Sequence, residues 1–215
     1  YKDYAGVLDY HPFISDVIFD TNQYELGYHR SDLFPTKSEL WNNVDPRFDY
    51  HFDFQGVMEE VAIETGSTIH ATKVCAQRAS VDLHDIVPQI HYIKKDVPSY
   101  PVVAQLKSAE KHRSLDNNPE VLEALSKFDV YYMPDKKMLG FQQFVSTINN
   151  CKLFVGTESC GSTIARGLNK PIVAFYQTEY RRQVLGYDNM KTLLFNQTHK
   201  LDKILGETWD RLKIF

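Results

Sequence analysis

Small and hydroxyl-bearing residues between two apolar runs have the types and spacing that suit phosphate binding. They are Gly156, Thr157, Ser159, Gly161, Ser162 and Thr163. Glycine lets the backbone approach a ligand closely, the first N–H groups of a helix have no intrahelical partner, and hydroxyls add donors. The stretch therefore predicts a site for a phosphate or diphosphate. Because the same residue types also cap helices, a capped turn without a ligand is the alternative.

Arginines after the next apolar run could face the same ligand. Arg181 and Arg182 follow the run that ends near Phe175. If that run is a strand of an open parallel sheet, both residues lie near its carboxyl edge, where such sheets bind ligands. Either guanidinium could pair with a phosphate. The alternative is the solvent-facing start of a helix.

The histidines and cysteines have no metal-binding spacing. The chain has 8 His and 3 Cys, without His-x-x-x-His, His-Glu-x-x-His or Cys-x-x-Cys. Asp49 and Asp53 are four residues apart, which in a strand places both on one face as ordinary polar residues. We therefore expect no metal site. The odd number of cysteines argues against a disulfide framework and favours a reducing cytoplasm.

Apolar runs that alternate with helix-like stretches from Pro101 onward predict an α/β fold with a parallel sheet. The expected strands are Val102–Leu106, Phe128–Met133, Lys152–Val155, Ile172–Phe175 and Thr192–Phe195. The expected helices run from Asn118-Pro119 to Leu125, from Gly140 to Asn149, from Ser162 to Leu168 with an end at Asn169, and from Leu201 to Phe215. The phosphate-binding stretch then follows the third strand.

The first hundred residues are less regular. Ile14–Phe19 and His51–Gln55 are predicted strands, and Val57–Thr65 is a predicted helix. Two prolines between Val97 and Pro101 stop both helix and central strand, so this segment predicts a linker. We expect domains at residues 1–97 and 98–215.

Composition excludes several classes of function. The 215 residues are 43% hydrophobic, which supports a packed core, and their net charge of −4 gives no field that gathers nucleic acid or anionic lipid. No apolar run is long enough to span a membrane, and no signal peptide is recognised at Tyr1. A cytoplasmic protein without nucleic-acid binding is expected.

Residues 156–171 resemble the signature of the ADP-heptose:lipopolysaccharide heptosyltransferases and their relatives. In that GT-B family a strand ends in Gly-x-Asp-Ser-Gly, a short helix carries His and Ala, and Gly-Lys-Pro leads into the next strand. The matching pieces here are Gly156-Thr157-Glu158-Ser159, Ala165-Arg166-Gly167-Leu168 and Asn169-Lys170-Pro171. Three positions depart from the signature: Glu158 replaces Asp, Cys160 replaces Gly and Thr163 replaces the helical His.

The resemblance implies a GT-B-like α/β fold with two lobes. Residues 1–97 would be a partial N-terminal, acceptor-side lobe whose opening part precedes Tyr1, and residues 98–215 would be a Rossmann-like lobe that binds a nucleotide sugar. The implied activity is an inverting, metal-independent glycosyltransferase without a cofactor. Its implied partners are a nucleotide-diphosphate-sugar donor, a glycan or other hydroxyl-bearing acceptor, and, peripherally, other assembly components.

The resemblance also assigns roles to residues. Lys111 and Glu158 would be catalytic, with Arg113 and Lys107 as alternates to Lys111. Backbone N–H groups at Ser162 and Thr163 would help Lys111 to stabilise the leaving diphosphate. The implied donor-binding residues are Thr157, Ser159, Gly161, Ser162, Thr163 and Arg181.

Two alternatives to this enzyme differ in class. One is a noncatalytic or degenerate relative that keeps the fold as a binding or assembly module. The other is a generic nucleotide-binding Rossmann-like protein, which is disfavoured because no Gly-x-Gly-x-x-Gly follows a predicted strand with an acidic residue beyond it.

Overall fold

The computed structural model describes residues 69–78, 80, 82–83, 86–108, 111–133, 140–187 and 190–213. The strands predicted at Ile14–Phe19 and His51–Gln55, and the helix predicted at Val57–Thr65, lie outside the described residues. The same holds for most of the predicted N-terminal lobe.

Five parallel strands form a sheet in the order β2-β1-β3-β4-β5. The strands are β1 (Val102–Gln105), β2 (Val130–Tyr132), β3 (Leu153–Thr157), β4 (Ile172–Tyr176) and β5 (Lys191–Leu194). The α/β class with a parallel sheet is therefore confirmed. Each strand overlaps its predicted range, with ends shifted by at most two residues.

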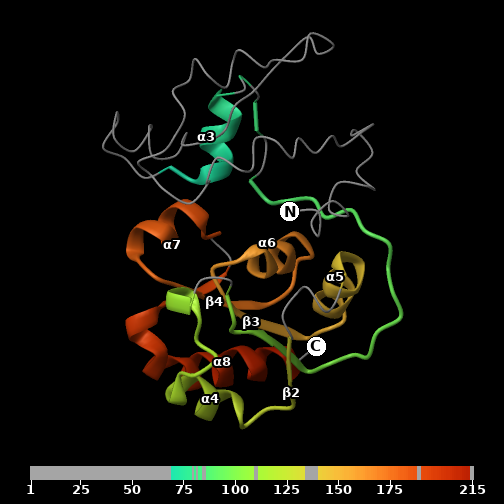
Figure 1. The fold of residues 1–215 in the computed structure, drawn as a ribbon, viewed down its shortest axis with the longest axis vertical. Helices are drawn as coiled ribbons and strands as arrows, with labels where there is room; N and C mark the ends of the chain where they lie inside the picture. The colour runs from blue at the N-terminus through green and yellow to red at the C-terminus, as the bar shows by residue number, and fades with distance from the viewer. Residues whose placement is uncertain are drawn as a thin grey trace.

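Helices cover both faces of this sheet (Figure 1). They are α4 (Pro119–Leu125), α5 (Phe141–Asn149), α6 (Cys160–Gly167), α7 (Glu179–Leu185) and α8 (Leu201–Lys213), with α3 (Ala71–Arg78) before the sheet and two 3₁₀ turns, η3 (Lys111–Arg113) and η5 (Phe195–Lys200). Successive residues of a strand point to opposite faces of the sheet and pack against different helices. Phe154 and Ala174 pack with α5 and α6, whereas Val155 and Val173 pack with α4 and α8.

Local sequence explains where these helices start and stop. The Asn118 side chain accepts a hydrogen bond from the Val121 N–H at 3.1 Å, and Pro119 occupies the first turn of α4. At the end of α6, Asn169 has φ 54°, which Asn tolerates better than most residues. The N–H groups of Asn169 and Lys170 then donate to the carbonyls of Arg166 and Ala165, the bond pair of a Schellman motif.

Residues 86–97 pack along α5 and α6 rather than away from them. The Ile93 N–H donates to Gln142 Oε1 at 2.7 Å, and the Lys95 N–H donates to Ser146 Oγ at 2.8 Å. A Cβ added at Gly167 would lie 2.5 Å from the Pro88 carbonyl oxygen, so the segment crosses α6 closely. The domain boundary at residue 97 stays a prediction, and part of the chain before it contacts the sheet's helical layer.

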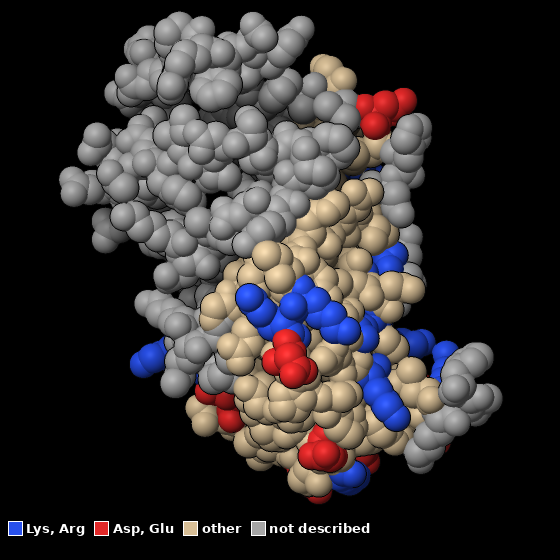
Figure 2. All heavy atoms as spheres, turned by 90° about the vertical axis from the view of Figure 1, so that its right-hand side faces the viewer, with Lys and Arg blue, Asp and Glu red and all other residues tan. Residues whose placement is uncertain are grey.

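Figure 2 shows one face of the molecule with its charged side chains in colour. Basic side chains are the more numerous charged groups on this face, and acidic ones lie directly beside them. The pocket described next lies at the carboxyl ends of the strands.

Candidate functional site

A pocket of about 240 Å³ lies beyond the carboxyl ends of β3 and β4. Its polar lining residues are His70, Thr72, Arg113, Glu158, Ser159, Ser162, Thr163 and Arg181, and the others are Ala71, Tyr176, Leu185, Tyr187 and Met190. The strand order reverses direction between β1 and β3. Open α/β sheets bind ligands where such a reversal separates neighbouring strand ends. Arg113, which follows β1, lines the pocket from the other side of this reversal, so the pocket adjoins the place where the topology favours a ligand.

Glu158 forms the floor of the pocket, directly after β3. Its side chain is only 2% exposed, and its Oε1 lies 2.8 Å from Arg181 Nη1 and 3.6 Å from Arg113 Nε. The second oxygen, Oε2, accepts a long hydrogen bond from the Gln177 N–H at 3.5 Å. Burying a carboxylate is costly unless it is paired, and the two arginines supply that pairing.

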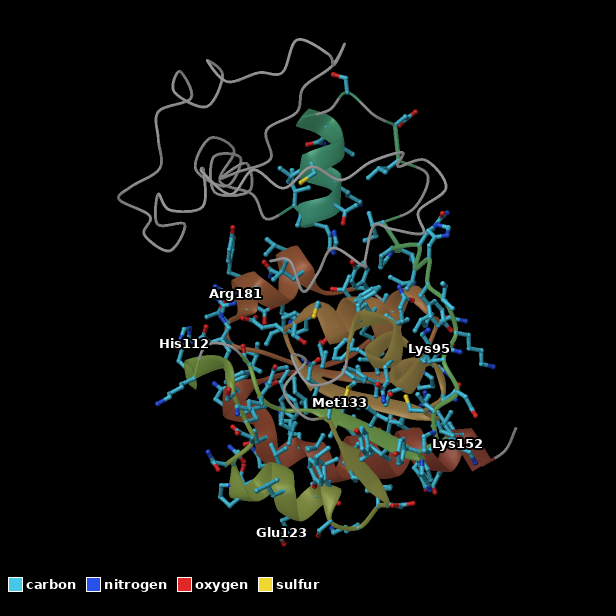
Figure 3. All side chains as sticks on the ribbon, turned by 45° about the vertical axis from the view of Figure 1, so that its right-hand side comes forward. Lys95, His112, Glu123, Met133, Lys152 and Arg181 are labelled. Carbon is cyan, nitrogen blue, oxygen red and sulfur yellow. The ribbon has the colours of Figure 1, made fainter. Side chains whose placement is uncertain are left out.

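The two arginines reach Glu158 from different elements. Arg113 ends η3, after β1, and Arg181 lies in the first turn of α7, after β4. Figure 3 shows Arg181 and His112, the neighbour of Arg113, on the same side of the molecule. A guanidinium carries five N–H donors, more than one carboxylate oxygen can take. Both side chains line the pocket, so the pair presents donors and positive charge to an anion there.

The start of α6 adds a second anion-attracting feature. Ser159 is the N-cap residue, yet its side chain does not cap the helix. Its hydroxyl instead donates to Gln105 Oε1 at 3.0 Å, at the end of β1. The positive end of the helix dipole therefore faces the pocket without a side-chain cap from Ser159.

Not every group expected at this turn points to the pocket. The Thr163 N–H donates to the Ser159 carbonyl oxygen at 3.4 Å, so this N–H has a partner within the helix, and Thr163 is one of the residues that line the pocket. The Ser162 hydroxyl donates to the Thr157 carbonyl oxygen at 2.7 Å. The contact of the Ser162 and Thr163 N–H groups with a diphosphate stays a prediction.

The structure brings together Glu158, Ser159, Ser162, Thr163 and Arg181 around one pocket. Thr157 and Gly161 are buried behind this wall and do not line it. Lys111 and Lys107 are exposed and lie outside the lining, whereas their alternate Arg113 is part of it. The functional roles of all these residues stay predictions.

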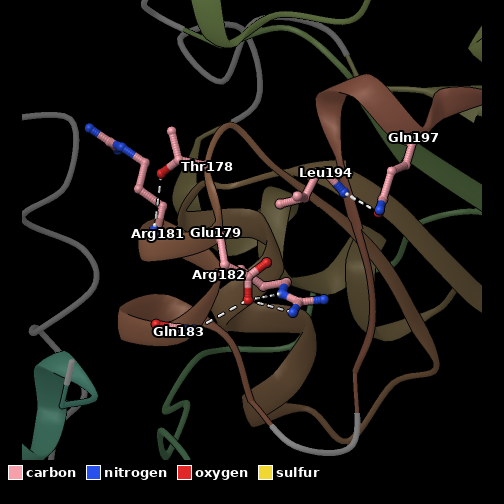
Figure 4. Close-up of polar contacts among 7 residues, drawn as sticks. All are labelled: Thr178, Glu179, Arg181, Arg182, Gln183, Leu194 and Gln197. Carbon is pink, nitrogen blue, oxygen red and sulfur yellow. Dashed lines mark hydrogen bonds and ion pairs between the residues drawn. The ribbon is translucent and has the colours of Figure 1, made fainter. Parts of the chain in front are cut away.

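Arg181 and Arg182 separate into different environments, as Figure 4 shows for the start of α7. The Thr178 side chain caps the helix by accepting the Arg181 N–H at 3.2 Å, and Arg181 turns toward Glu158. Arg182 turns to Glu179 Oε1, with Nη2 at 2.5 Å. Of the two, only Arg181 lines the pocket, and its pairing with a phosphate stays a prediction.

Sequence reasoning missed the residues that close the pocket from the other side. His70 and Thr72 come from the start of α3, where the Thr72 N–H donates to His70 Nδ1 at 3.2 Å. The His70 ring lies 4.8 Å from the Tyr187 ring. Burial raises the pKa of Tyr187. No motif or spacing marks these residues, because their proximity arises only from the fold.

The geometry of His70 limits its chemistry. Because Nδ1 accepts a backbone N–H, the proton of neutral His70 is assigned to Nε2. In this tautomer the ring can donate a hydrogen bond, whereas acceptance of a proton at Nδ1 would break the bond to Thr72. Glu158 is the one carboxylate among the described residues that line the pocket, and both arginines contact it. The arrangement therefore suits anion binding better than proton abstraction.

Two further findings concern the described part of the chain. Its His, Cys, Asp and Glu side chains form no group of three or more that could hold a metal ion. None of its helices combines the length and the apolar character that a membrane span requires.

Comparison with known proteins gave matches among solved structures. No family model matches the sequence, and no curated protein matches it. One similar structure is the bacterial iron-containing dodecameric glycosyltransferase TibC from enterotoxigenic E. coli H10407, at 12% identity and a TM-score of 0.49, with 68% of this chain and 55% of that chain covered. Another is the dodecameric iron-containing heptosyltransferase TibC in complex with ADP-D-beta-D-heptose, at 13% identity and a TM-score of 0.43, with 58% and 39% covered.

Both TM-scores lie below 0.5, so neither match carries an argument about this chain. This chain covers 55% of the first structure's chain and 39% of the second structure's chain. At 12% and 13% identity they assign neither a family nor a reaction to this chain.

Proposed function

We propose that this chain carries the donor-binding half of a glycosyltransferase and that the pocket holds the diphosphate of a nucleotide-sugar donor. The observation that carries the proposal is the convergence of Arg113 and Arg181 on Glu158 beside the start of α6. Cations and helix N–H groups in a partly enclosed site stabilise the charge that develops on a leaving nucleoside diphosphate. The resemblance of residues 156–171 to heptosyltransferases supports the same donor class.

The size of the pocket narrows what it would hold. Its volume of about 240 Å³ lies below the range of about 300–1,000 Å³ common for ligand sites. We assign it to the diphosphate and the adjoining part of the sugar, with the rest of the donor extending outside. The proposed reaction is a single displacement with inversion that needs no metal, in which a base and an acceptor come from beyond this pocket.

The second candidate is a noncatalytic module that binds a nucleotide sugar or another phosphorylated ligand. It is favoured by one observation: Glu158, the one carboxylate among the described lining residues, is already paired with both arginines. A pocket built in this way can bind an anion without activating an acceptor hydroxyl.

Calorimetric titration with ADP-glucose, UDP-glucose and GDP-mannose tests the donor site. We expect micromolar binding of at least one donor and a loss of about 10- to 100-fold in Arg113→Gln and in Arg181→Gln, since a hydrogen bond to a charged group contributes about 1.5–3 kcal/mol. Arg182→Gln is the matched control, because Arg182 neighbours Arg181 but lies outside the pocket. Equal losses in all three variants would reject the assignment.

Turnover separates the two candidates. A transferase releases nucleoside diphosphate in the presence of a suitable hydroxyl-bearing acceptor, so we would measure this release with the tightest-binding donor across a panel of glycans. Donor binding that survives the controls, without any release of nucleoside diphosphate, would favour the binding module.

A further inference from the structure

Glu158 is the most deeply buried charged group of the site, and the proposed donor chemistry gives it no task of its own. Its side chain is 2% exposed, whereas those of Arg113 and Arg181 are 25% and 32% exposed. The carboxylate therefore lies beneath the arginines, and an anion that enters the pocket meets the guanidinium groups first.

We propose that Glu158 is a positioning residue. It gathers Arg113 and Arg181 into an anion-binding pair before a ligand arrives, and it does not contact the transferred sugar. The inference deepens the donor site and rests on the proposed function for the identity of the anion, a diphosphate.

Glu158 is held in place by backbone hydrogen bonds close to its carboxylate, whereas the arginine head groups lie at the ends of long side chains. The Glu158 N–H continues the β3–β4 pairing by donating to the Phe175 carbonyl oxygen at 2.8 Å. Its Oε2 accepts the Gln177 N–H at 3.5 Å, and its Oε1 meets both guanidinium groups. A short, buried side chain anchored on the sheet thus provides one reference point for two long, partly exposed side chains.

Electrostatics explain why a carboxylate between the two arginines would favour anion binding. Two guanidinium groups in one pocket repel each other, and long side chains lose conformational freedom when a ligand has to collect them. A carboxylate between the two guanidinium groups attracts both of them and offsets their repulsion. It also orders the two arginine side chains before the ligand arrives, so the ligand binds a preorganised pair. The two arginines and Glu158 together retain a net positive charge, which an incoming diphosphate can still use.

A direct role in contacting a sugar fits the same observations poorly. Both oxygens of Glu158 are engaged, one by the arginines and the other by a backbone N–H. The side chain is also longer by one methylene than the Asp of the heptosyltransferase signature, and that length carries the carboxylate to the arginines.

A double-mutant cycle tests this inference with inorganic pyrophosphate as the probe. Glu158→Gln keeps the shape and removes the charge, and we expect it to weaken pyrophosphate binding by about tenfold or more. If Glu158 acts through the arginines, the same substitution in an Arg181→Gln background should weaken binding by about threefold at most.

An undiminished effect of Glu158→Gln in the Arg181→Gln background would mean direct contact with the ligand. Tighter binding by Glu158→Gln would mean that the carboxylate only competes with the anion. Either result would overturn the proposal.

A second readout needs no ligand. The guanidinium N–H signals of Arg113 and Arg181 in ¹⁵N NMR spectra should shift in Glu158→Gln and return in part in Glu158→Asp, which restores the charge on a shorter side chain. The signals of Arg182, which pairs with Glu179, should stay in place in both variants. Unchanged Arg113 and Arg181 signals in Glu158→Gln would refute positioning even if that variant still binds. Signals that shift in Glu158→Gln, together with a wild-type chain that binds neither pyrophosphate nor a nucleotide sugar, would keep the positioning role and reject the proposed function.

Discussion

The absence of a side chain at Gly161 shapes the pocket wall at the scale of single residues. A Cβ there would lie 2.0 Å from Gln105 Oε1 and 3.0 Å from the Phe154 ring. Gln105 is 8% exposed, and its Oε1 accepts the Ser159 hydroxyl. Any side chain at residue 161 therefore has to move the amide that keeps Ser159 away from the first turn of α6.

We predict that Gly161→Ala weakens pyrophosphate binding about fivefold, which corresponds to the loss of one hydrogen bond of about 1 kcal/mol. Once displaced from Gln105, the Ser159 side chain is free to cap α6 and to compete with the anion. Gly206→Ala in α8 is the control, because no heavy atom lies within 4 Å of its added Cβ. We expect unchanged binding there and a gain in stability of about 0.5–1 kcal/mol. Calorimetry and urea unfolding measure both quantities, and identical binding by the two variants would contradict this account.

At the scale of elements, the N-terminal cap of α7 helps to position Arg181 in the site. Thr178 accepts the Arg181 N–H at 3.2 Å, so the cap and the ligand-facing side chain share one helical turn. Asn118 caps α4 in the same way, at 3.1 Å from the Val121 N–H, but α4 lies against α8 on the other face of the sheet. The two caps form a matched pair.

Replacement of either cap by alanine should destabilise the protein by about 1 kcal/mol. Only Thr178→Ala should also weaken pyrophosphate binding, by several-fold, because fraying of the first turn of α7 releases Arg181 from Glu158. Urea unfolding gives the stability of each variant and calorimetry gives its affinity. A similar loss of affinity in Asn118→Ala would show that general destabilisation, rather than the position of Arg181, causes the effect.

The sequence predicted the strands and helices better than it predicted the residues of the site. Strands and helices followed from periodicity and from local signals such as the Asn118-Pro119 start of α4, because those signals act within a few residues. The choice of Arg113 over Lys111 did not follow, since both lie in a three-residue turn whose side chains point in different directions. Gln105 and His70 join the site only through tertiary contacts, and periodicity does not encode the strand order that brings β1 beside β3.

At the scale of the whole molecule, the pocket is assembled from distant parts of the chain. The start of α3, η3 after β1, the turn after β3, and α7 after β4 all contribute lining residues. Ligand affinity should therefore depend on global stability as well as on local contacts. Alkaline pH offers a way to change that stability through a group remote from the anion.

Cys151 is that group. It is 3% exposed in the core beside α5, and its Sγ donates to the Ile148 carbonyl oxygen at 3.1 Å. Burial raises the pKa of the thiol from 9.0 to about 11. A pKa raised by folding means that the folded state favours the protonated thiol. The associated stability is complete below about pH 9 and is lost as the pH rises toward 11.

We predict that the free energy of unfolding of the wild-type chain falls by roughly 2–3 kcal/mol across this window through Cys151, at about 1.4 kcal/mol per unit of pKa shift. Cys151→Ala should start lower at pH 8, because it leaves a small cavity, and should then fall less steeply. Some slope will remain in both chains, since burial also raises the pKa of Tyr176. Urea unfolding curves at intervals from pH 8 to pH 10.5 give both slopes. Parallel slopes would show that the Cys151 thiol keeps an ordinary pKa in the folded protein and that water reaches the layer between α5 and the sheet.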